Sequence, residues 1–202
     1  MKITVLFPTN TEASQFHRDD VTSIISGVGL TATTLSTIYA IQKNTSDVLI
    51  LAGIAGKFFH SELKINDVVL VESELEGDFG FFTKSGFMHM AHLPIDMDFE
   101  RRHTLLCPHI PQGLPFPLVR GMSVNAAIAP FVDTREADIE NMEGAAFFYT
   151  CLIENQKFLE LRAISNLVSL DDTDWDMEQS VAALTKGLHQ LIDHLQSQSV
   201  NK

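Results

Sequence analysis

Short apolar runs alternate with helical patterns along this chain, and this alternation is the feature that most restricts its fold. Runs bounded by turn residues predict buried strands at Ile3–Phe7, Val21–Ser26, Val48–Ala52, Asp67–Ser73 and Leu161–Ser165. Helical patterns separate or follow these runs at Thr31–Lys43, Glu143–Ile153 and Ser180–Gln196. Strands that alternate with helices predict a largely parallel sheet sandwiched by helices. Ligands in such folds bind at the carboxyl ends of the strands, so the residues there are the first candidates for a site.

The composition argues against several classes of partner. The 202 residues suffice for one domain with a substantial core, and 26 acidic against 14 basic side chains give a net charge of −12. A body this acidic repels phosphate backbones and anionic lipids, which argues against nucleic acid and membrane surfaces. A nucleoside, which has no phosphate, remains compatible with this charge.

The cysteines and histidines predict neither a disulfide nor a metal site. Cys107 and Cys151 are far apart in the sequence, and His89 and His92 lack an evident third ligand. We therefore expect no metal and no cofactor. The start of the chain, from Met1, is too quickly polar for a signal peptide, and no apolar run approaches the length of about 18 residues needed for a membrane span. The expected location is the cytoplasm.

Two glycine-containing segments follow predicted strands. In Ser26–Thr31, Gly27 and Gly29 let backbone N–H groups approach a ligand at a helix N-terminus, but the motif alone favours a tight turn without a ligand. A dinucleotide site is not favoured, because Ala32 breaks the G-x-G-x-x-G pattern. In Ala52–Gly56, the small residues either open space over the sheet or only allow close packing.

The segment Ile139–Ala146 brings two carboxylates and an amide to the start of a helix. Glu143 lies close to the helix N-terminus, where the helix dipole stabilises an anion, and a carboxylate suits the paired hydroxyls of a ribose. Met142 offers a flexible, polarizable surface for a sugar or a flat ring. The pattern alone also fits an ordinary acidic helix start.

Two further polar residues are expected at the same edge of the sheet. Asn166 ends a strong apolar run, where functional side chains often lie, although a strand-terminating turn residue gives the same pattern. Glu12 follows the first strand and the loop Pro8–Thr11, so it can reach this edge, although many such glutamates only cap or solvate a helix.

Taken together and in order, these segments resemble the nucleoside phosphorylase/nucleosidase superfamily. The resemblance extends from the first strand to Trp175 and rests on Gly27–Gly29, Asp47–Gly56, Leu63–Val71, Asn141–Ala146 and Arg162–Asn166. Each motif alone is weak, whereas the ordered set is fairly specific. The resemblance implies one nucleoside phosphorylase-like domain over residues 1–202, a three-layer α/β/α fold with a central mixed, mostly parallel sheet.

Within this superfamily the chain is most similar to the futalosine hydrolase family. Glu76–Gly80, Glu140–Ala146 and Ile164–Asn166 carry the similarity, with Trp175 downstream. The methylthioadenosine/S-adenosylhomocysteine nucleosidases are similar but carry Asp at the position of Asn166. An amide can donate to O6 of a 6-oxopurine and accept from its protonated N7, whereas a carboxylate is repelled by O6. Asn166 therefore favours hypoxanthine over adenine as the leaving base.

The resemblance also implies roles for individual residues. Glu12 would orient and deprotonate the attacking water, and Asn166 would stabilise the departing base by hydrogen bonding, because an amide is no strong acid. The remaining residues would bind substrate: Ala55 and Gly56 line the sugar pocket, Met142 packs under the sugar, Glu143 holds the ribosyl hydroxyls, and Ser165 supports Asn166.

Water rather than phosphate is the expected nucleophile. Phosphorylases of the superfamily bind phosphate with arginines and a Gly-Gly-type loop, whereas here Lys57 follows Gly56 and only Arg18 precedes Arg101. The expected activity is hydrolysis of futalosine to hypoxanthine and dehypoxanthinyl futalosine in menaquinone biosynthesis. A purine nucleoside phosphorylase, an adenine-releasing nucleosidase and a non-catalytic nucleoside-binding homologue remain alternatives. Family members are usually homo-oligomers, and the aromatic segment Phe79–Phe87 could form an interface or a lid.

Overall fold

Eight strands form one mixed sheet within the part of the chain that the computed structural model describes, residues 1–43, 45–93, 103–170 and 175–200. They are β1 (Ile3–Phe7), β2 (Val21–Ile25), β3 (Val48–Lys57), β4 (Val68–Glu76), β7 (Leu105–Leu106), β8 (Leu118–Ser123), β9 (Ile139–Asn141) and β10 (Phe158–Leu167). Their order is β10-β4-β8-β9-β3-β1-β2, with β7 paired to β4. Because β3 also pairs with β10, the strands β3, β10, β4, β8 and β9 close into a ring.

The strand directions confirm the predicted mixed, mostly parallel sheet. Parallel pairing joins β1 to β2 and β3, β3 to β10, and β8 to β4 and β9. Antiparallel pairing joins β4 to β10 and β7, and β3 to β9. The strands β1, β3 and β10 are buried on both faces, which explains why they appear in the sequence as continuous apolar runs.

The strands β3, β4 and β10 are longer than the sequence predicts, and the extension of β3 matters for the site. The predicted strand ends at Ala52, whereas β3 continues to Lys57, so the small residues that follow Ala52 lie within the strand and not beyond it. The strand continues because β10 pairs with β3 as far as Lys57, and β9 pairs with Gly56 and Lys57. These pairings place the end of β3 between β10 and β9.

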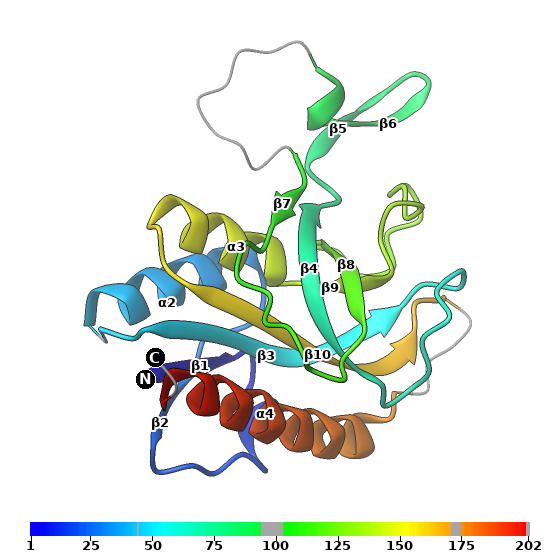
Figure 1. Ribbon diagram of the computed structural model, residues 1–202. Helices are drawn as coiled ribbons and strands as arrows, with labels where there is room; N and C mark the ends of the chain where they lie inside the picture. The colour runs from blue at the N-terminus through cyan, green and yellow to red at the C-terminus, as the bar shows by residue number, and fades with distance from the viewer. Residues whose placement is uncertain (44, 94–102, 171–174, 201–202) are drawn as a thin grey trace.

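Helices cover both faces of the sheet, as Figure 1 shows, which confirms the predicted three layers. The helices α2 (Leu30–Lys43) and α3 (Gly144–Ile153) lie side by side on one face, and α4 (Met177–Val200) lies on the other. The short helix α1 (Asn10–Ala13) follows β1. The sequence accounts for α4 because its apolar stripe is buried: Val181, Leu184, Leu188, Leu191, Ile192 and Leu195.

A hairpin of β5 (Gly80–Thr83) and β6 (Gly86–His89) projects from the body beyond β4 (Figure 1), and the short 3-10 helix η1 (Met90–His92) follows it. The Phe82 ring, 66% exposed, contacts the rings of Phe87 and Phe131. Whether this segment forms an interface or a lid stays a prediction. Cys107 and Cys151 are both buried and unpaired by disulfides. Across the described ranges, no helix combines the length and the apolar character that a membrane crossing requires.

Candidate active site

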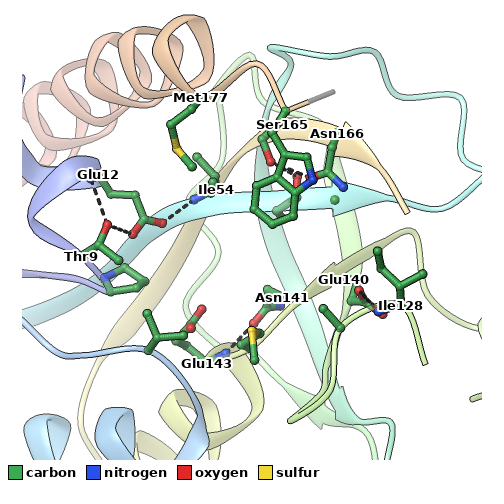
Figure 2. A pocket seen from close by; sticks show the side chains of 17 residues that line it. Thr9, Glu12, Ile54, Ile128, Glu140, Asn141, Glu143, Ser165, Asn166 and Met177 are labelled. Carbon is green, nitrogen blue, oxygen red and sulfur yellow. Dashed lines mark hydrogen bonds between the residues drawn. The ribbon is translucent and has the colours of Figure 1, made fainter. Parts of the chain in front are cut away.

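A pocket lies beside the ends of β3, β9 and β10 and the segments that follow β1 and β9 (Figure 2). It is lined by every residue that the sequence predicts for the site: Glu12, Ala55, Gly56, Met142, Glu143, Ser165 and Asn166. The fold thus brings together positions that are distant along the chain. The role predicted for each of them remains a prediction.

Other lining residues are missing from the sequence-based prediction. They are Pro8, Thr9, Val28, Ile54, Ala127, Ile128, Glu140, Asn141, Trp175 and Met177. Glu140 and Asn141 stand next to Met142 in one motif, so their position gave a signal that they belong to the site. Ala127 and Ile128 lie in a loop that carries no distinguishing pattern, and only the folded structure places them here.

Glu12 is fixed at one side of the pocket (Figure 2). The Thr9 hydroxyl accepts from the Glu12 backbone N–H at 3.2 Å and donates to Glu12 Oε2 at 2.5 Å. The Ile54 N–H donates to Glu12 Oε1 at 3.0 Å. Burial raises the pKa of Glu12, and the hydrogen bonds from Thr9 and Ile54 and the charge of Arg162 counteract only part of this effect. A carboxylate with a raised pKa is a stronger general base than a carboxylate with the ordinary pKa.

A single buried guanidinium organises the carboxylates behind the pocket. Arg162 donates through Nε to Glu160 Oε1 at 2.7 Å, and through both Nη1 and Nη2 to Glu143 Oε2 at 3.2 Å. Nη1 also donates to the Ile54 carbonyl at 3.0 Å, and Nη2 to Asn141 Oδ1 at 3.2 Å. Burial alone would lower the pKa of Arg162, but Glu160 and Glu143 hold it above its ordinary value. The guanidinium therefore stays charged and fixes the orientation of Glu143.

Two glycines make this arrangement possible. A Cβ on Gly53 would lie 2.5 Å from Arg162 Nη1 and 2.9 Å from Glu12 Oε1, so only glycine allows both side chains to approach. Gly29, with φ +91°, donates its N–H to Glu143 Oε1 at 3.1 Å. The glycine turn after β2 therefore holds the Glu143 carboxylate.

Glu74 lies deeper, fully buried beneath the start of α3. The Asn141 amide donates to Glu74 Oε1 at 2.6 Å, and the Ser123 hydroxyl lies 2.9 Å from Glu74 Oε2 and 3.0 Å from Asn141 Oδ1. One hydroxyl proton cannot serve both oxygens, and a protonated Glu74 supplies the second. Burial and the neighbouring Glu160 carboxylate raise the pKa of Glu74 well above its ordinary value. We therefore assign Glu74 as neutral and Glu160 as the charged partner of Arg162.

Asn166 lies at the opposite end of the pocket from Glu12 (Figure 2). A β-bulge between Ile164 and Asn166 places Ser165 and Asn166 at the pocket edge. Ser165 Oγ donates to Asn166 Oδ1 at 2.8 Å, and Asn166 Nδ2 donates to the Leu167 carbonyl at 3.1 Å. The amide is thus oriented with one N–H and one oxygen lone pair left for a ligand.

The pocket combines apolar walls with negative charge. Among the residues that the structure describes, no Lys or Arg lines it. Arg18 pairs with Asp20 and Asp193 instead, and the Lys57 ammonium donates to the Ser61 carbonyl. Arg101 lies outside the described residues. No group of three or more metal-binding side chains occurs within the described ranges. Such a site stabilises a developing positive charge and disfavours a phosphate dianion.

Comparison with known proteins gives a consistent result. The model of the phosphorylase superfamily matches residues 8–196. A futalosine hydrolase of Thermus thermophilus is 29% identical over 182 residues, covering 83% of this chain and 79% of the relative.

Solved structures show the same fold at lower sequence identity. A mutant of futalosine hydrolase from Helicobacter pylori superposes with a TM-score of 0.75 at 18% identity and covers 96% of this chain and 99% of its own. A methylthioadenosine/S-adenosylhomocysteine nucleosidase from the same organism, with butyl-thio-DADMe-Immucillin-A, gives a TM-score of 0.74 at 18% identity, covering 96% of this chain and 98% of its own. At this identity the likeness establishes the fold.

Proposed function

Because this chain belongs to the phosphorylase superfamily, we propose that it hydrolyses the N-glycosidic bond of futalosine and releases hypoxanthine. The observation that carries the proposal is the placement of Asn166 at one end of a pocket that has Glu12 and Glu143 at the other. The amide suits a 6-oxopurine, and the carboxylates suit the sugar and its developing charge. The similarity to the Thermus thermophilus futalosine hydrolase supports the same substrate.

Glu12 is proposed to act on the attacking water. In the reaction, the bond between C1′ and N9 breaks, and its electron pair leaves with the base. Water adds to C1′ from the side of Glu12 and transfers a proton to its carboxylate. Because Thr9 and Ile54 occupy one acceptor position on each oxygen, the carboxylate is held in place and retains lone pairs for the water.

Glu143 is proposed to bind the ribosyl part. Its Oε2 is used by Arg162, whereas Oε1 accepts only the Gly29 N–H among these contacts and so keeps a lone pair for a sugar hydroxyl. Met142, Ala55 and Gly56 complete the surface around the sugar. The negative charges of Glu12 and Glu143 stabilise the oxocarbenium-like sugar that forms as the base leaves.

Asn166 is proposed to stabilise the departing base. The free N–H of Nδ2 donates to O6, solvent water protonates N7, and Oδ1 accepts from the resulting N7–H, while Ser165 holds the amide in this orientation. The proton taken up by Glu12 returns to solvent, so the overall reaction consumes one water and no net proton. Phosphate is disfavoured as the nucleophile because the described lining of the pocket holds carboxylates and no Lys or Arg. We also keep as proposals that the reaction belongs to menaquinone biosynthesis, that the protein is cytoplasmic, and that it acts as a homo-oligomer.

The test is incubation of the purified protein with futalosine, inosine and methylthioadenosine, each with and without phosphate, with chromatographic detection of the free base. Release of hypoxanthine from futalosine in phosphate-free buffer supports the proposal. Strict dependence on phosphate points to a phosphorylase, and equal release of adenine from methylthioadenosine contradicts the role of Asn166.

A further inference from the structure

Glu140 closes the same end of the pocket as Asn166, and we propose that it selects the base by accepting the N1–H of a 6-oxopurine. Glu140 is buried yet lines the pocket, and the mechanism above gives it no task. The inference rests on the proposed function, since it names a contact to the base within the same site.

The register of the sheet places Glu140 and Asn166 on either side of one glycine. Gly56 in β3 pairs with Asn166 in β10 and with Glu140 in β9. Neighbouring strands lie about 4.8 Å apart, so the two flanking Cα atoms are separated by roughly 10 Å. A Cβ built on Gly56 would lie 2.7 Å from Val168 Cγ2 and 3.1 Å from Asn166 Nδ2, so the absence of a side chain lets the Asn166 amide pack against the backbone of β3. Gly56, Glu140 and Asn166 all line the pocket, so a ligand at this end contacts both polar groups.

Figure 2 shows the same division of the pocket into two ends. Asn166 and Glu140 lie at one end with Ile128, and Glu12 and Glu143 lie towards the other. When the ribosyl group lies between Glu12 and Glu143, the base points towards Asn166 and Glu140. In a purine attached through N9, O6 and N1 lie on the ring remote from the sugar, and O6 is flanked by N7 on one side and by N1 on the other. A base whose O6/N7 edge meets Asn166 therefore presents N1 towards Glu140.

The backbone N–H of Ile128 holds the Glu140 carboxylate, which is the hydrogen-bond acceptor at this end of the pocket. Ile128 has φ +60°, an unusual conformation for a β-branched residue, and its N–H donates to Glu140 Oε1 at 2.9 Å. This backbone donor is therefore already used by the carboxylate. A carboxylate offers about four acceptor sites, so Glu140 keeps acceptors for a ligand. Burial raises the pKa of Glu140 because it disfavours the charged carboxylate, and a hydrogen bond from the N1–H of the base would stabilise that charged form.

The contacts of Glu140 and Asn166 then both distinguish hypoxanthine from adenine. Hypoxanthine carries a donor at N1 and an acceptor at O6, which match Glu140 and the Asn166 amide. Adenine carries an acceptor at N1 and a donor at the 6-amino group, so its N1 faces the lone pairs of Glu140 without a proton between them. A mismatched buried polar contact of this kind is expected to weaken binding about ten- to a hundredfold.

The test measures binding of the free bases, so it does not depend on turnover. Trp175 is the only tryptophan and lines the pocket, so its fluorescence reports occupancy. Hypoxanthine, 1-methylhypoxanthine and adenine are titrated into the wild type, Glu140→Gln, Glu140→Ala and the control Asp138→Asn. Asp138 directly precedes β9 and pairs with Arg120 away from the pocket, so its substitution removes a nearby carboxylate without touching the base. Far-UV circular dichroism checks that each variant is folded.

The expected results differ between the two substitutions of Glu140. In Glu140→Gln, the Ile128 N–H holds the amide oxygen, so the NH2 faces the base. Hypoxanthine affinity should fall about tenfold or more, and the preference over adenine should vanish or reverse. In Glu140→Ala, hypoxanthine and 1-methylhypoxanthine should bind with similar affinity, whereas the wild type and Asp138→Asn should discriminate between them.

Equal binding of hypoxanthine and 1-methylhypoxanthine by the wild type overturns the inference. So does a Glu140→Gln variant that keeps the wild-type preference for hypoxanthine over adenine. Failure of the proposed function gives a different pattern: no hypoxanthine is released from futalosine, while the base-binding preference and its dependence on Glu140 persist.

Discussion

Substitution of Arg162 by Met tests whether one guanidinium holds the acidic groups of the site together. The side chains of Arg162, Glu160 and Glu143 are 1%, 0% and 6% exposed, so water cannot replace the lost cation. Removing one partner of such a buried pair costs about 3–5 kcal/mol of the free energy of unfolding. Met keeps most of the apolar volume, so the loss reports the charge and its hydrogen bonds.

Urea denaturation followed by far-UV circular dichroism measures this cost. The matched control is Arg120→Met, which removes an equally short-range pair with Asp138 whose side chains are 44% and 26% exposed. Solvent screens that pair, so its loss is expected to cost less than about 1 kcal/mol. Adding Glu160→Gln to Arg162→Met should recover part of the stability, because it removes a charge left without a partner. A loss for Arg162→Met no larger than that of the control would refute the reasoning.

Three further substitutions test single groups. Burial and Glu160 raise the pKa of Glu74 above its ordinary 4.5, so protonated Glu74 stabilises the fold fully below pH 4.5 and less as the pH rises through the folded-state pKa. The stability of Glu74→Gln relative to the wild type should therefore grow with pH. A difference in urea denaturation that stays constant with pH contradicts a neutral Glu74. Glu12→Gln should lower kcat about a hundredfold or more. Because burial raises the pKa of Glu12, the acid limb of the wild-type pH–rate profile should lie above pH 4.5, and an acid limb below that value counts against Glu12 as the base. Asn166→Asp should lower kcat/KM for futalosine about tenfold or more, and unchanged kinetics would exclude a direct contact with the base.

Much of the fold was predictable because local pattern and tertiary structure agree. The alternation of apolar runs and amphipathic stretches predicts the layers, and α4 buries the stripe that its sequence shows. The end of β3 was not predictable, because glycine and alanine disfavour a strand by propensity. Pairing of Gly56 with strands on both sides, a long-range effect, overrides that preference.

The residues of the candidate site were predictable only where a motif carried them. Glu143 and Asn166 stand in short patterns at element ends, and the structure places both on the pocket. The buried residues behind them were harder to assign, although Glu160 and Arg162 alternate within a strand and so lie on one face. Ile128 acts through its backbone, which leaves no trace in the residue type. Sequence patterns report side chains, whereas a backbone donor depends on the conformation of its loop.

The most direct test of the central claim is hydrolysis of futalosine in phosphate-free buffer made with 18O-labelled water, followed by mass spectrometry of both products. We expect hypoxanthine without label and dehypoxanthinyl futalosine carrying the label on the sugar, with the reaction strongly reduced in Glu12→Gln. Absence of hypoxanthine, or its release only when phosphate is added, would contradict the assignment of this pocket as a nucleoside hydrolase.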